Sequence, residues 1–345
     1  MKVPILGISP NINITTDKGV VEVRNLACAI EVGVKVKPIT PYKLKNSSGE
    51  WVNVVSVTNL GTQYVRDFIV EDGRCFVVGD NQRVLTNKGL LSGDNIKTDI
   101  EITLQAEGDI DYPPVEWVEG FPSFPLDTNS LSTLKLLGMI TAFGRVIPEL
   151  GVIGLEDVQS RTVVDFTNLM ETVFHLAPED MVKTKQTTNK VSVHYTHVGL
   201  ARWLNGLLNR GIPCEVMRAS KEQILMFLKG MYDQRYSQTQ TPIKGAKYVY
   251  YGNKPVVARQ VFSLLKVLGY SPRLLNEQDH KYSVLTTGVN IHEDSKLRSN
   301  LYKDVTTKTV RVKEVCGYLD EVYLIEIDQG NNYIADGLVI NTGVI

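Results

Sequence analysis

Hydrophobic and polar positions follow two different periods along this chain of 345 residues. In the first part they alternate, which is typical of half-buried strands, in runs at 20–26, 52–57 and 64–70. Turn-forming residues recur at 46–49, 59–61 and 92–94, and Asp72-Gly73 separates two apolar runs. An Asp-Gly pair in that setting predicts a two-residue hairpin turn, because such a turn needs positive φ. The first part of the chain is therefore predicted to form an antiparallel all-β unit.

Beyond a proline-containing segment, the hydrophobic period becomes helical. Prolines at positions 113, 114, 122 and 125 indicate a linker over residues 109–129. Helices are predicted over residues 131–143, 156–176, 196–210, 221–233 and 254–268, with strand-like runs at 190–195, 247–251 and 282–286. Ser220 and Gln223 have the pattern of a capping box, and Gly211 and Gly269 follow two helices as C-cap residues do. This middle region is predicted to be an α+β unit.

The alternating pattern returns after residue 305, in runs at 310–312, 322–327 and 333–340. An order of β, then α+β, then β is most simply explained by a domain inserted into a split β domain, since loop tips tolerate inserted domains. The sequence therefore predicts a multi-domain chain.

The middle region contains an internal repeat. Residues 136–140 and 228–232 share an apolar helical stretch with a central glycine, Gly138 in one and Gly230 in the other. A glycine inside a helix costs about 1 kcal/mol relative to alanine. Its presence at both positions predicts a close helix–helix approach with the two glycines at one interface. The alternative is that both positions merely tolerate glycine.

Composition limits the class of protein. The chain has 37 Lys and Arg against 38 Asp and Glu, and 43% of its residues are hydrophobic, as in ordinary globular proteins. The sequence has no apolar run of membrane-spanning length, and its N-terminus is too short in apolar residues for a signal peptide. The four cysteines are widely separated, which argues against a zinc site or a disulfide scaffold and favours a cytoplasmic location.

Charge is distributed unevenly along the chain. Residues 101–200 include 14 acidic and 6 basic residues, a net charge of −8, whereas residues 201–300 include 15 basic and 7 acidic residues, a net charge of +8. This split indicates distinct modules or two halves of one module, although ordinary variation in surface charge explains it equally well. The five histidines all lie in the middle region and are interpreted as surface or capping residues, so no metal site is expected.

The two ends of the chain resemble the splicing domain of inteins. Residues 322–327 and 331–342 (NNYIADGLVINT) resemble the last strands of an intein, and residues 7–19 resemble its opening. Residues 79–86, with 92–96 after them, resemble the second sequence block of that family. The resemblance implies an all-β, horseshoe-like Hint splicing domain formed by residues 7–105 and 306–341. Residues 1–6 and 342–345 would then be flanks of the host protein, the exteins.

The middle region is similar to a LAGLIDADG homing endonuclease. The two motifs of that family correspond to residues 136–144 and 228–236, and residues 220–223 and 257–269 also resemble it. The resemblance implies a two-repeat α+β endonuclease-like insert over residues 106–305.

The intein resemblance assigns roles at the two junctions. In that family a first Cys or Ser attacks the preceding carbonyl, the residue after the intein attacks the resulting ester, and the final Asn cyclises. Asn341 is present for cyclisation, and Thr342 is a candidate downstream nucleophile. Gly7, at the first position, has no side chain, so the ordinary acyl shift at the Leu6–Gly7 bond is excluded.

The helper positions also depart from the family pattern. The Thr and His of the second block correspond to Gly79 and Gln82, and two further helper histidines correspond to Asn331 and Ile340. Gln82 can form hydrogen bonds but cannot shuttle a proton near neutral pH, and Ile340 is apolar. We therefore expect splicing to be impaired or blocked. The splicing reaction itself would require no cofactor. Two alternatives remain. One is slow cleavage of the chain after Asn341, and the other is direct attack by Thr342 on the Leu6–Gly7 amide.

The endonuclease resemblance implies a metal site that this sequence has lost. Each LAGLIDADG helix should end in a carboxylate that holds a divalent metal between the two helices. Phe143 and Arg235 occupy those places, and Asp233 corresponds to an earlier, structural acid. No DNA cleavage is predicted, and Mg²⁺ would be needed only if nuclease activity survives. The alternative is a nuclease with relocated acids, such as Glu149 or Asp233.

Basic residues of the second half of the insert are candidates for binding duplex DNA. They are Arg202, Arg210, Arg218, Lys244 and Lys247. The acidic first half should oppose wrapping of a duplex, and a solvated face explains the basic residues as well. The competing hypothesis for the whole chain is a monomeric, non-splicing DNA-binding or structural remnant of a homing endonuclease.

Overall fold

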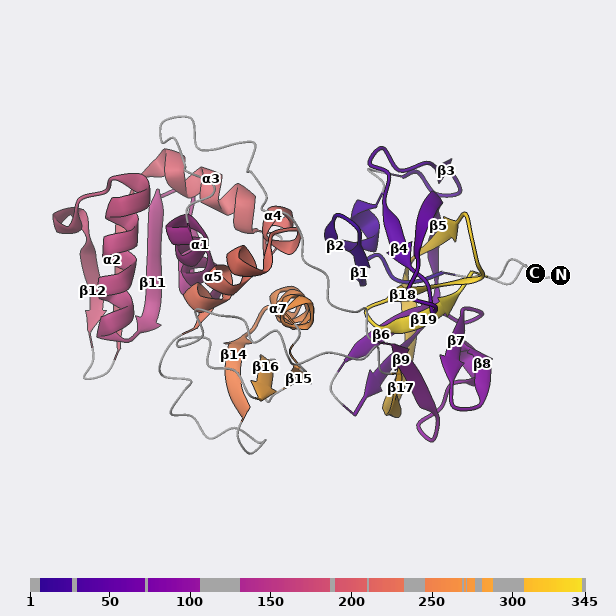
Figure 1. Ribbon diagram of the computed structural model, residues 1–345. Coiled ribbons are helices and arrows are strands. Elements are labelled where there is room, and N and C mark those ends of the chain that lie inside the picture. Colours follow the sequence, from indigo (N-terminus) through magenta and orange to yellow (C-terminus); the bar gives the residue numbers. More distant parts are fainter. Residues whose placement is uncertain are drawn as a thin grey trace. The chain divides into compact units, whose positions relative to one another are not determined.

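The structure is a computed structural model that describes residues 7–26, 30–71, 74–105, 131–186, 190–209, 211–232, 246–268, 270, 272–276, 281–287 and 307–342. The chain divides into two compact units (Figure 1). One comprises Met1–Ile110 and Ser299–Ile345 and is called the β unit below, and the other comprises Asp111–Arg298 and is called the α+β unit. In the described part of the chain, none of the helices combines the length and the apolar character that crossing a membrane requires.

Antiparallel strands of one sheet form the β unit. The described strands are β1 (Asn13–Thr16), β2 (Gly19–Glu22), β3 (Lys35–Val36), β4 (Lys43–Lys45), β5 (Trp51–Val70), β6 (Cys75–Gly79), β7 (Arg83–Thr86), β8 (Gly89–Ser92), β9 (Glu101–Gln105), β17 (Thr307–Ile327), β18 (Asn332–Ala335) and β19 (Leu338–Asn341). Their order is β18-β19-β7-β9-β17-β5-β4-β1-β2, with β3 and β6 also paired to β5 and β8 paired to β7. Short 3-10 helices occur at Val23–Asn25 and Gly93–Asn95.

Two long strands, β5 and β17, pair with each other and form the centre of this sheet. The turn predicted at residues 59–61 is wrong, because β5 continues through it. Asn59 Oδ1 accepts a hydrogen bond from Gly61 N (2.8 Å), Gly61 has a φ of +71°, and the pairing register shifts nearby, between Glu321 and Tyr323. The turn-forming residues therefore make an irregularity inside a continuous strand, as in a β-bulge.

The C-terminal run predicted at 333–340 is a hairpin rather than one strand. Asp336 and Gly337 have φ values of +51° and +85°, which a two-residue turn of this kind requires, and they join β18 to β19. The register pairs Asn332 with Asn341, so the last residue of β19 lies at the open end of the hairpin.

The chain leaves the β unit and returns to it at neighbouring points. β9 and β17 pair antiparallel, and Gln105 lies directly opposite Thr307. These two residues are the last described before the α+β unit and the first described after it. The insertion therefore interrupts what would otherwise be the end of a β-hairpin.

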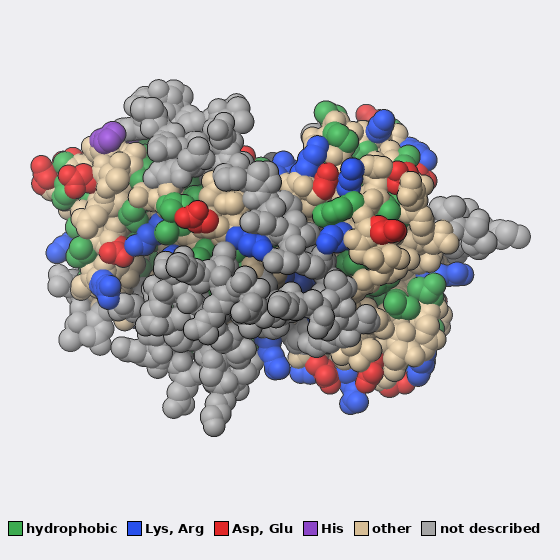
Figure 2. Space-filling model, viewed as in Figure 1, with side chains coloured by type: hydrophobic (Ala, Val, Ile, Leu, Met, Phe, Trp, Pro, Cys, Tyr) green, Lys and Arg blue, Asp and Glu red, His purple; other side chains and the backbone are tan. Residues whose placement is uncertain are grey.

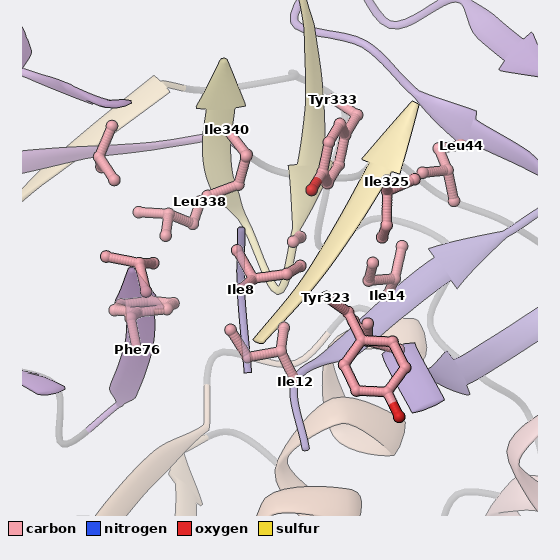
Figure 3. Close-up of a cluster of buried hydrophobic side chains, with 14 of the residues drawn as sticks. Ile8, Ile12, Ile14, Leu44, Phe76, Tyr323, Ile325, Tyr333, Leu338 and Ile340 are labelled. Carbon is pink, nitrogen blue, oxygen red and sulfur yellow. The ribbon is translucent and has the colours of Figure 1, made fainter. Parts of the chain in front are cut away.

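One buried cluster joins the two ends of the described chain. It includes Ile8 and Ile14 from the N-terminal segment and Leu338 and Ile340 from β19. Figure 3 shows the side chains of Ile8, Leu338 and Ile340 in this cluster, with Phe76 of β6 nearby. Because these residues are fully buried or nearly so, their burial stabilises the approach of the first segment to the last.

The two halves of the α+β unit have similar orders of elements. Its first half has α1 (Leu131–Phe143), β10 (Gly144–Ile147), β11 (Val152–Val158), α2 (Ser160–Phe174), β12 (Val182–Gln186), β13 (Val191–Thr196) and α3 (Val198–Leu208), with a 3-10 turn at Pro178–Asp180. Its second half has α4 (Cys214–Met217), α5 (Lys221–Met231), β14 (Ala246–Gly252), α7 (Pro255–Val267), β15 (Arg273–Asn276) and β16 (Tyr282–Thr287). The sheets run β10-β11-β13-β12 and β14-β16-β15, so β11, β13 and β12 correspond in order to β14, β16 and β15.

Helices α1 and α5 meet at the two glycines of the sequence repeat. A Cβ atom on Gly138 would lie 2.0 Å from Phe227 O, and one on Gly230 would lie 1.9 Å from Lys135 O. No side chain fits at either place, because the obstructing atoms belong to the backbone of the other helix. The prediction that both glycines lie at one helix–helix interface is confirmed.

Some predicted boundaries shift. α1 begins and ends as predicted, and the capping box at Ser220 is present, with Gln223 N donating to Ser220 Oγ and Ser220 N to Gln223 Oε1. The helix predicted from residue 156 begins at Ser160 instead, because β11 continues to Val158 and pairs there with β13. The predicted linker, the Asp72-Gly73 turn and Gly269 lie outside the described residues.

Candidate functional site

The N-terminal segment is held by hydrogen bonds between β6 and β17. Gly7 O accepts a hydrogen bond from Gly79 N (2.9 Å), and Ser9 N donates to Val77 O (3.0 Å). Ile8 forms two hydrogen bonds with Tyr323, Ile8 N to Tyr323 O (3.0 Å) and Tyr323 N to Ile8 O (2.9 Å). These bonds place Gly7 at the end of β6.

The surroundings of Gly7 fit glycine and no other residue. Its φ is +152°, and a Cβ atom would lie 2.3 Å from Val322 Cγ1 and 2.9 Å from Tyr323 O. A cysteine or serine here would need both a different backbone conformation and displacement of Val322. The local packing thus leaves no room for a nucleophilic side chain at this position.

A single turn after β6 contacts both ends of the predicted splicing domain. Within the turn, Gln82 N donates to Gly79 O (2.9 Å). Gly79 binds the carbonyl of Gly7, and the side chain of Gln82 donates from Nε2 to Asn341 O (2.7 Å) and to Arg83 O (3.1 Å). Gln82 is only 1% exposed. The group Gly7, Gly79, Gln82, Asn341 and Thr342 is called the junction site below.

The peptide bond after Asn341 is held on both sides. Its carbonyl oxygen accepts from Gln82, and its N–H, which belongs to Thr342, donates to Asn331 O (2.8 Å). Thr342 is 6% exposed, and within the described residues its buried Oγ1 has no hydrogen-bond partner. A buried hydroxyl of this kind is a candidate reactive group.

The residues predicted from the sequence to form the site make different kinds of contact in the structure. Gly79 contacts Gly7 through its main chain, whereas the Gln82 side chain contacts Asn341, at the other predicted junction. Asn331 contributes its main-chain carbonyl, and its exposed side chain is not needed for that contact. Ile340 is fully buried in the cluster of Figure 3. The two main-chain groups could not be found from side-chain types, because every residue carries them.

None of the five junction residues has an ionisable side chain. Two tyrosines are backbone neighbours of this region: Tyr333 is paired with Ile340, and Tyr323 is paired with Ile8. Burial raises the pKa of Tyr333, and burial together with the negative charge of Glu321 raises the pKa of Tyr323, so both stay protonated. The junction site therefore offers hydrogen-bond donors and acceptors but no group that titrates near neutral pH.

The end of α1 does not fit a divalent metal. Phe143 is the last residue of that helix, is 8% exposed and has no oxygen atom in its side chain. Within the described residues, no group of three or more His, Cys, Asp and Glu side chains could hold a metal ion. Glu149 is exposed in the turn between β10 and β11, and Asp233 and Arg235 lie outside the described residues.

The predicted DNA-binding residues are only partly described. Arg202 is exposed on α3, and Arg218 is partly buried after α4. Arg210 and Lys244 lie outside the described residues, as does the side chain of Lys247 in β14. Among the residues that the structure describes, these basic side chains are therefore not seen together on one surface.

On one face of the β10-β11-β13-β12 sheet, an exposed basic residue is paired with an acidic one. Arg145, Gly154, His194 and Val182 are cross-strand neighbours and share one face. Arg145 forms an exposed ion pair with Glu156 (2.9 Å). In Figure 2 blue and red side chains are intermingled over the described residues, without a continuous blue patch in that view. Phosphate contacts from this face would have to compete with an existing ion pair.

Comparison with known proteins gives matches among solved structures alone. No protein-family model matches the chain, and no curated protein sequence matches it. A DnaB intein from Synechocystis sp. PCC 6803 is 20% identical, with 29% of this chain and 69% of that chain covered and a TM-score of 0.24. Mesophilic variants of the homing endonuclease I-DmoI are 12% identical, with 46% and 88% covered and a TM-score of 0.35.

Inteins and a homing endonuclease are thus among the similar structures. A further I-DmoI variant, in complex with its target DNA and in the presence of manganese, is 10% identical, with 46% of this chain and 87% of that chain covered and a TM-score of 0.34.

Proposed function

We propose that this chain is an intein whose β unit is a splicing domain and whose α+β unit is an endonuclease-like insert without cleavage activity. The observation that carries this proposal is the turn at residues 79–82, which binds Gly7 through Gly79 and Asn341 through Gln82. Protein splicing requires the two ends of the domain to meet, so that two flanking segments can be joined. The partners are the host-protein flanks, and the protein acts as a cytoplasmic monomer.

The two junctions differ in the chemistry they support. At the N-terminal junction Gly7 has no nucleophile, and its packing excludes a larger side chain. At the C-terminal junction Asn341 can cyclise on its own carbonyl, which releases Thr342 with a free amino group. The expected activity is therefore cleavage after Asn341, with splicing impaired or blocked. Ligation would require Thr342 to attack the Leu6–Gly7 amide directly.

The test uses a precursor with folded proteins fused before Met1 and after Ile345, incubated and analysed by intact mass. We expect products of cleavage after Asn341 and an N-terminal junction that stays intact. The matched control is Asn341→Ala, which keeps the backbone and removes the cyclising amide. A ligated product of the two flanks would contradict the block at Gly7, and persistence of the intact precursor over a wide range of pH would contradict the proposal as a whole.

We further propose that the insert does not cleave DNA. Phe143 cannot supply a metal ligand at the end of α1, and the corresponding position of the second repeat is Arg235. Incubation of a supercoiled plasmid library with the protein in Mg²⁺ or Mn²⁺ is expected to leave the plasmids intact. Nicking that disappears in Glu149→Gln or Asp233→Asn would instead establish relocated metal ligands.

Binding of duplex DNA by the insert is a second candidate function. It is favoured by the net charge of +8 over residues 201–300 and by the exposed side chains of Arg202 and Lys254. Gel-shift titrations at several salt concentrations test it, because phosphate contacts release counterions and make the affinity fall with salt. Absence of a salt-dependent shift at low ionic strength would exclude this function, whereas Arg202→Ala is expected to reduce the salt slope by about one if it contacts a phosphate.

A further inference from the structure

We propose that Gln82 polarises the carbonyl of the Asn341–Thr342 bond and stabilises the oxyanion formed there when Asn341 cyclises. This inference rests on the proposed function. The intein resemblance places Gln82 at the position of the second-block His, in the first part of the splicing domain. The structure instead places its Nε2 2.7 Å from Asn341 O, at the other junction.

The orientation of the Gln82 amide follows from its neighbours. The oxygen and nitrogen of a glutamine amide are hard to distinguish by shape, so the assignment depends on the hydrogen bonds they make. The Gln82 NH₂ group faces two main-chain carbonyls, Asn341 O and Arg83 O at 3.1 Å. Carbonyl oxygens only accept hydrogen bonds, and therefore only the NH₂ group can face both of them. One of its hydrogens anchors the amide to the neighbouring residue, and the other points at the reacting carbonyl.

Cyclisation places charge where this donor points. Asn341 Nδ2 attacks the main-chain carbonyl carbon of Asn341, a C–N bond forms, and the carbonyl π electrons move to the oxygen. The tetrahedral intermediate collapses to a succinimide as the bond to Thr342 N breaks. The proton lost by Nδ2 passes through water to Thr342 N, which leaves as a free amine. In the intermediate the oxygen carries the negative charge, and a hydrogen bond to it is stronger than one to the neutral carbonyl.

Burial and a second contact increase the effect. Gln82, Ile340 and Thr342 are all buried, so bulk water competes poorly for Asn341 O and the hydrogen bond acts in a low dielectric. The hydrogen bond from Thr342 N to Asn331 O (2.8 Å) fixes the plane of the same peptide group. The carbonyl is therefore held toward Gln82 before the reaction begins, and no reorganisation is needed during it.

The rate of cleavage after Asn341 tests this role in the full-length precursor with extended flanks. Gln82→Leu, which removes the donor at similar size, is expected to lower the first-order rate constant about 10²-fold, at the lower end of the effect of removing one oxyanion donor. The matched control is Gln105→Leu, because Gln105 Nε2 also donates to a main-chain carbonyl, Ser47 O (2.6 Å), but to none of the junction-site residues. A rate in Gln82→Leu equal to that of the wild type, or an equal fall in both variants, would overturn the proposal.

Gln82→Glu gives a readout that a structural role alone would not produce. Its carboxyl group can donate a hydrogen bond to Asn341 O when it is protonated, but as a carboxylate it repels the oxyanion. The cleavage rate of this variant relative to the wild type is therefore expected to fall as the pH rises through the titration of the introduced group. A constant ratio across that range would count against the role of the amide donor.

Isotope-edited infrared spectroscopy separates failure of this inference from failure of the proposed function. With ¹³C in the Asn341 carbonyl, Gln82→Leu is expected to shift its stretching band to higher frequency, whereas Gln105→Leu leaves it in place. This measurement needs no cleavage. A precursor that never cleaves contradicts the proposed function and, with it, the role of Gln82 in cyclisation. An unshifted band contradicts the contact itself.

Discussion

At the residue scale, the packing around Gly7 excludes any larger side chain. Its positive φ and the proximity of Val322 Cγ1 to a notional Cβ both select glycine. The residue type predicted that position 7 lacks a nucleophile, but it could not predict that Val322 and Tyr323 fill the space. Under the proposed function, introducing a cysteine or serine at position 7 is therefore not expected to enable splicing by itself.

Gly7→Ala is expected to lower the free energy of unfolding of the β unit by about 1–3 kcal/mol, from backbone strain and overpacking. Val322→Ala should reduce that loss when the two changes are combined, because it removes Cγ1, the nearest obstructing atom. Urea unfolding of the four proteins of the double-mutant cycle measures the coupling. Gly49→Ala is the control for strain alone, since Gly49 has a φ of +82° and no atom within 4 Å of its Cβ position. Equal effects at positions 7 and 49 would argue against the clash.

At the element scale, the sequence predicted which helices and strands form better than it predicted where they end and how they are connected. The 3.6-residue period located α5 and α7, because burial that favours one helix face repeats over three turns. Helix α1 was located instead by its continuous apolar stretch, since most of its positions are buried. Strand breaks were harder to predict, since the same Asn-Leu-Gly residues that make turns elsewhere make an irregularity inside β5 when β17 continues alongside. Long-range pairing of this kind overrides local turn preference. Asp336-Gly337 is the dipeptide typical of a two-residue hairpin turn. The alternating pattern on both sides of it led to the prediction of one continuous run.

The interface of α1 and α5 makes a prediction about its glycines. Gly138→Val or Gly230→Val is expected to destabilise the α+β unit by about 3 kcal/mol or more, because the new side chain meets backbone atoms that cannot rotate away. Gly206→Ala is the matched control, since Gly206 is an exposed glycine inside α3 with no atom within 4 Å of its Cβ position. That control should stabilise the helix by about 0.5–1 kcal/mol. Thermal unfolding followed by circular dichroism compares the three variants, and equal effects would refute a tight interface.

At the scale of the whole molecule, acid is expected to weaken the β unit through Glu326. Hydrogen bonds from Lys35 and from Ser56 hold the pKa of this carboxyl below its ordinary value. A carboxyl with a lowered folded-state pKa contributes stability above its unfolded pKa and loses that contribution as the pH falls through the folded value. Glu326→Gln should therefore cost up to about 1 kcal/mol at neutral pH and nothing once the wild-type carboxyl is protonated. Urea midpoints measured from neutral to acidic pH test this, and a difference that is independent of pH would contradict it.

The position of the insertion predicts that the β unit can exist without the α+β unit. Because Gln105 pairs with Thr307, replacing residues 106–306 by Asn-Gly closes a two-residue hairpin in the existing register. This shortened protein is expected to fold and to cleave after Asn341 at a rate within about twofold of the full chain, since it retains every described junction contact. The control linker is Pro-Pro, which cannot adopt the positive φ that the turn requires. Failure of the Asn-Gly protein to fold would show that the insert stabilises the β unit.

The pairing of β9 with β17 also has a consequence for the order of folding during synthesis. Roughly 200 residues separate Gln105 from Thr307, and bringing the ends of so long a loop together costs conformational entropy that grows with the logarithm of its length. An insert that folds first removes most of that loop before β17 is made, and so lowers the cost of closing the sheet. A destabilised insert, such as Gly230→Val, should then slow the formation of the β unit in refolding experiments. Junction chemistry would in this way begin only after the inserted domain has been built.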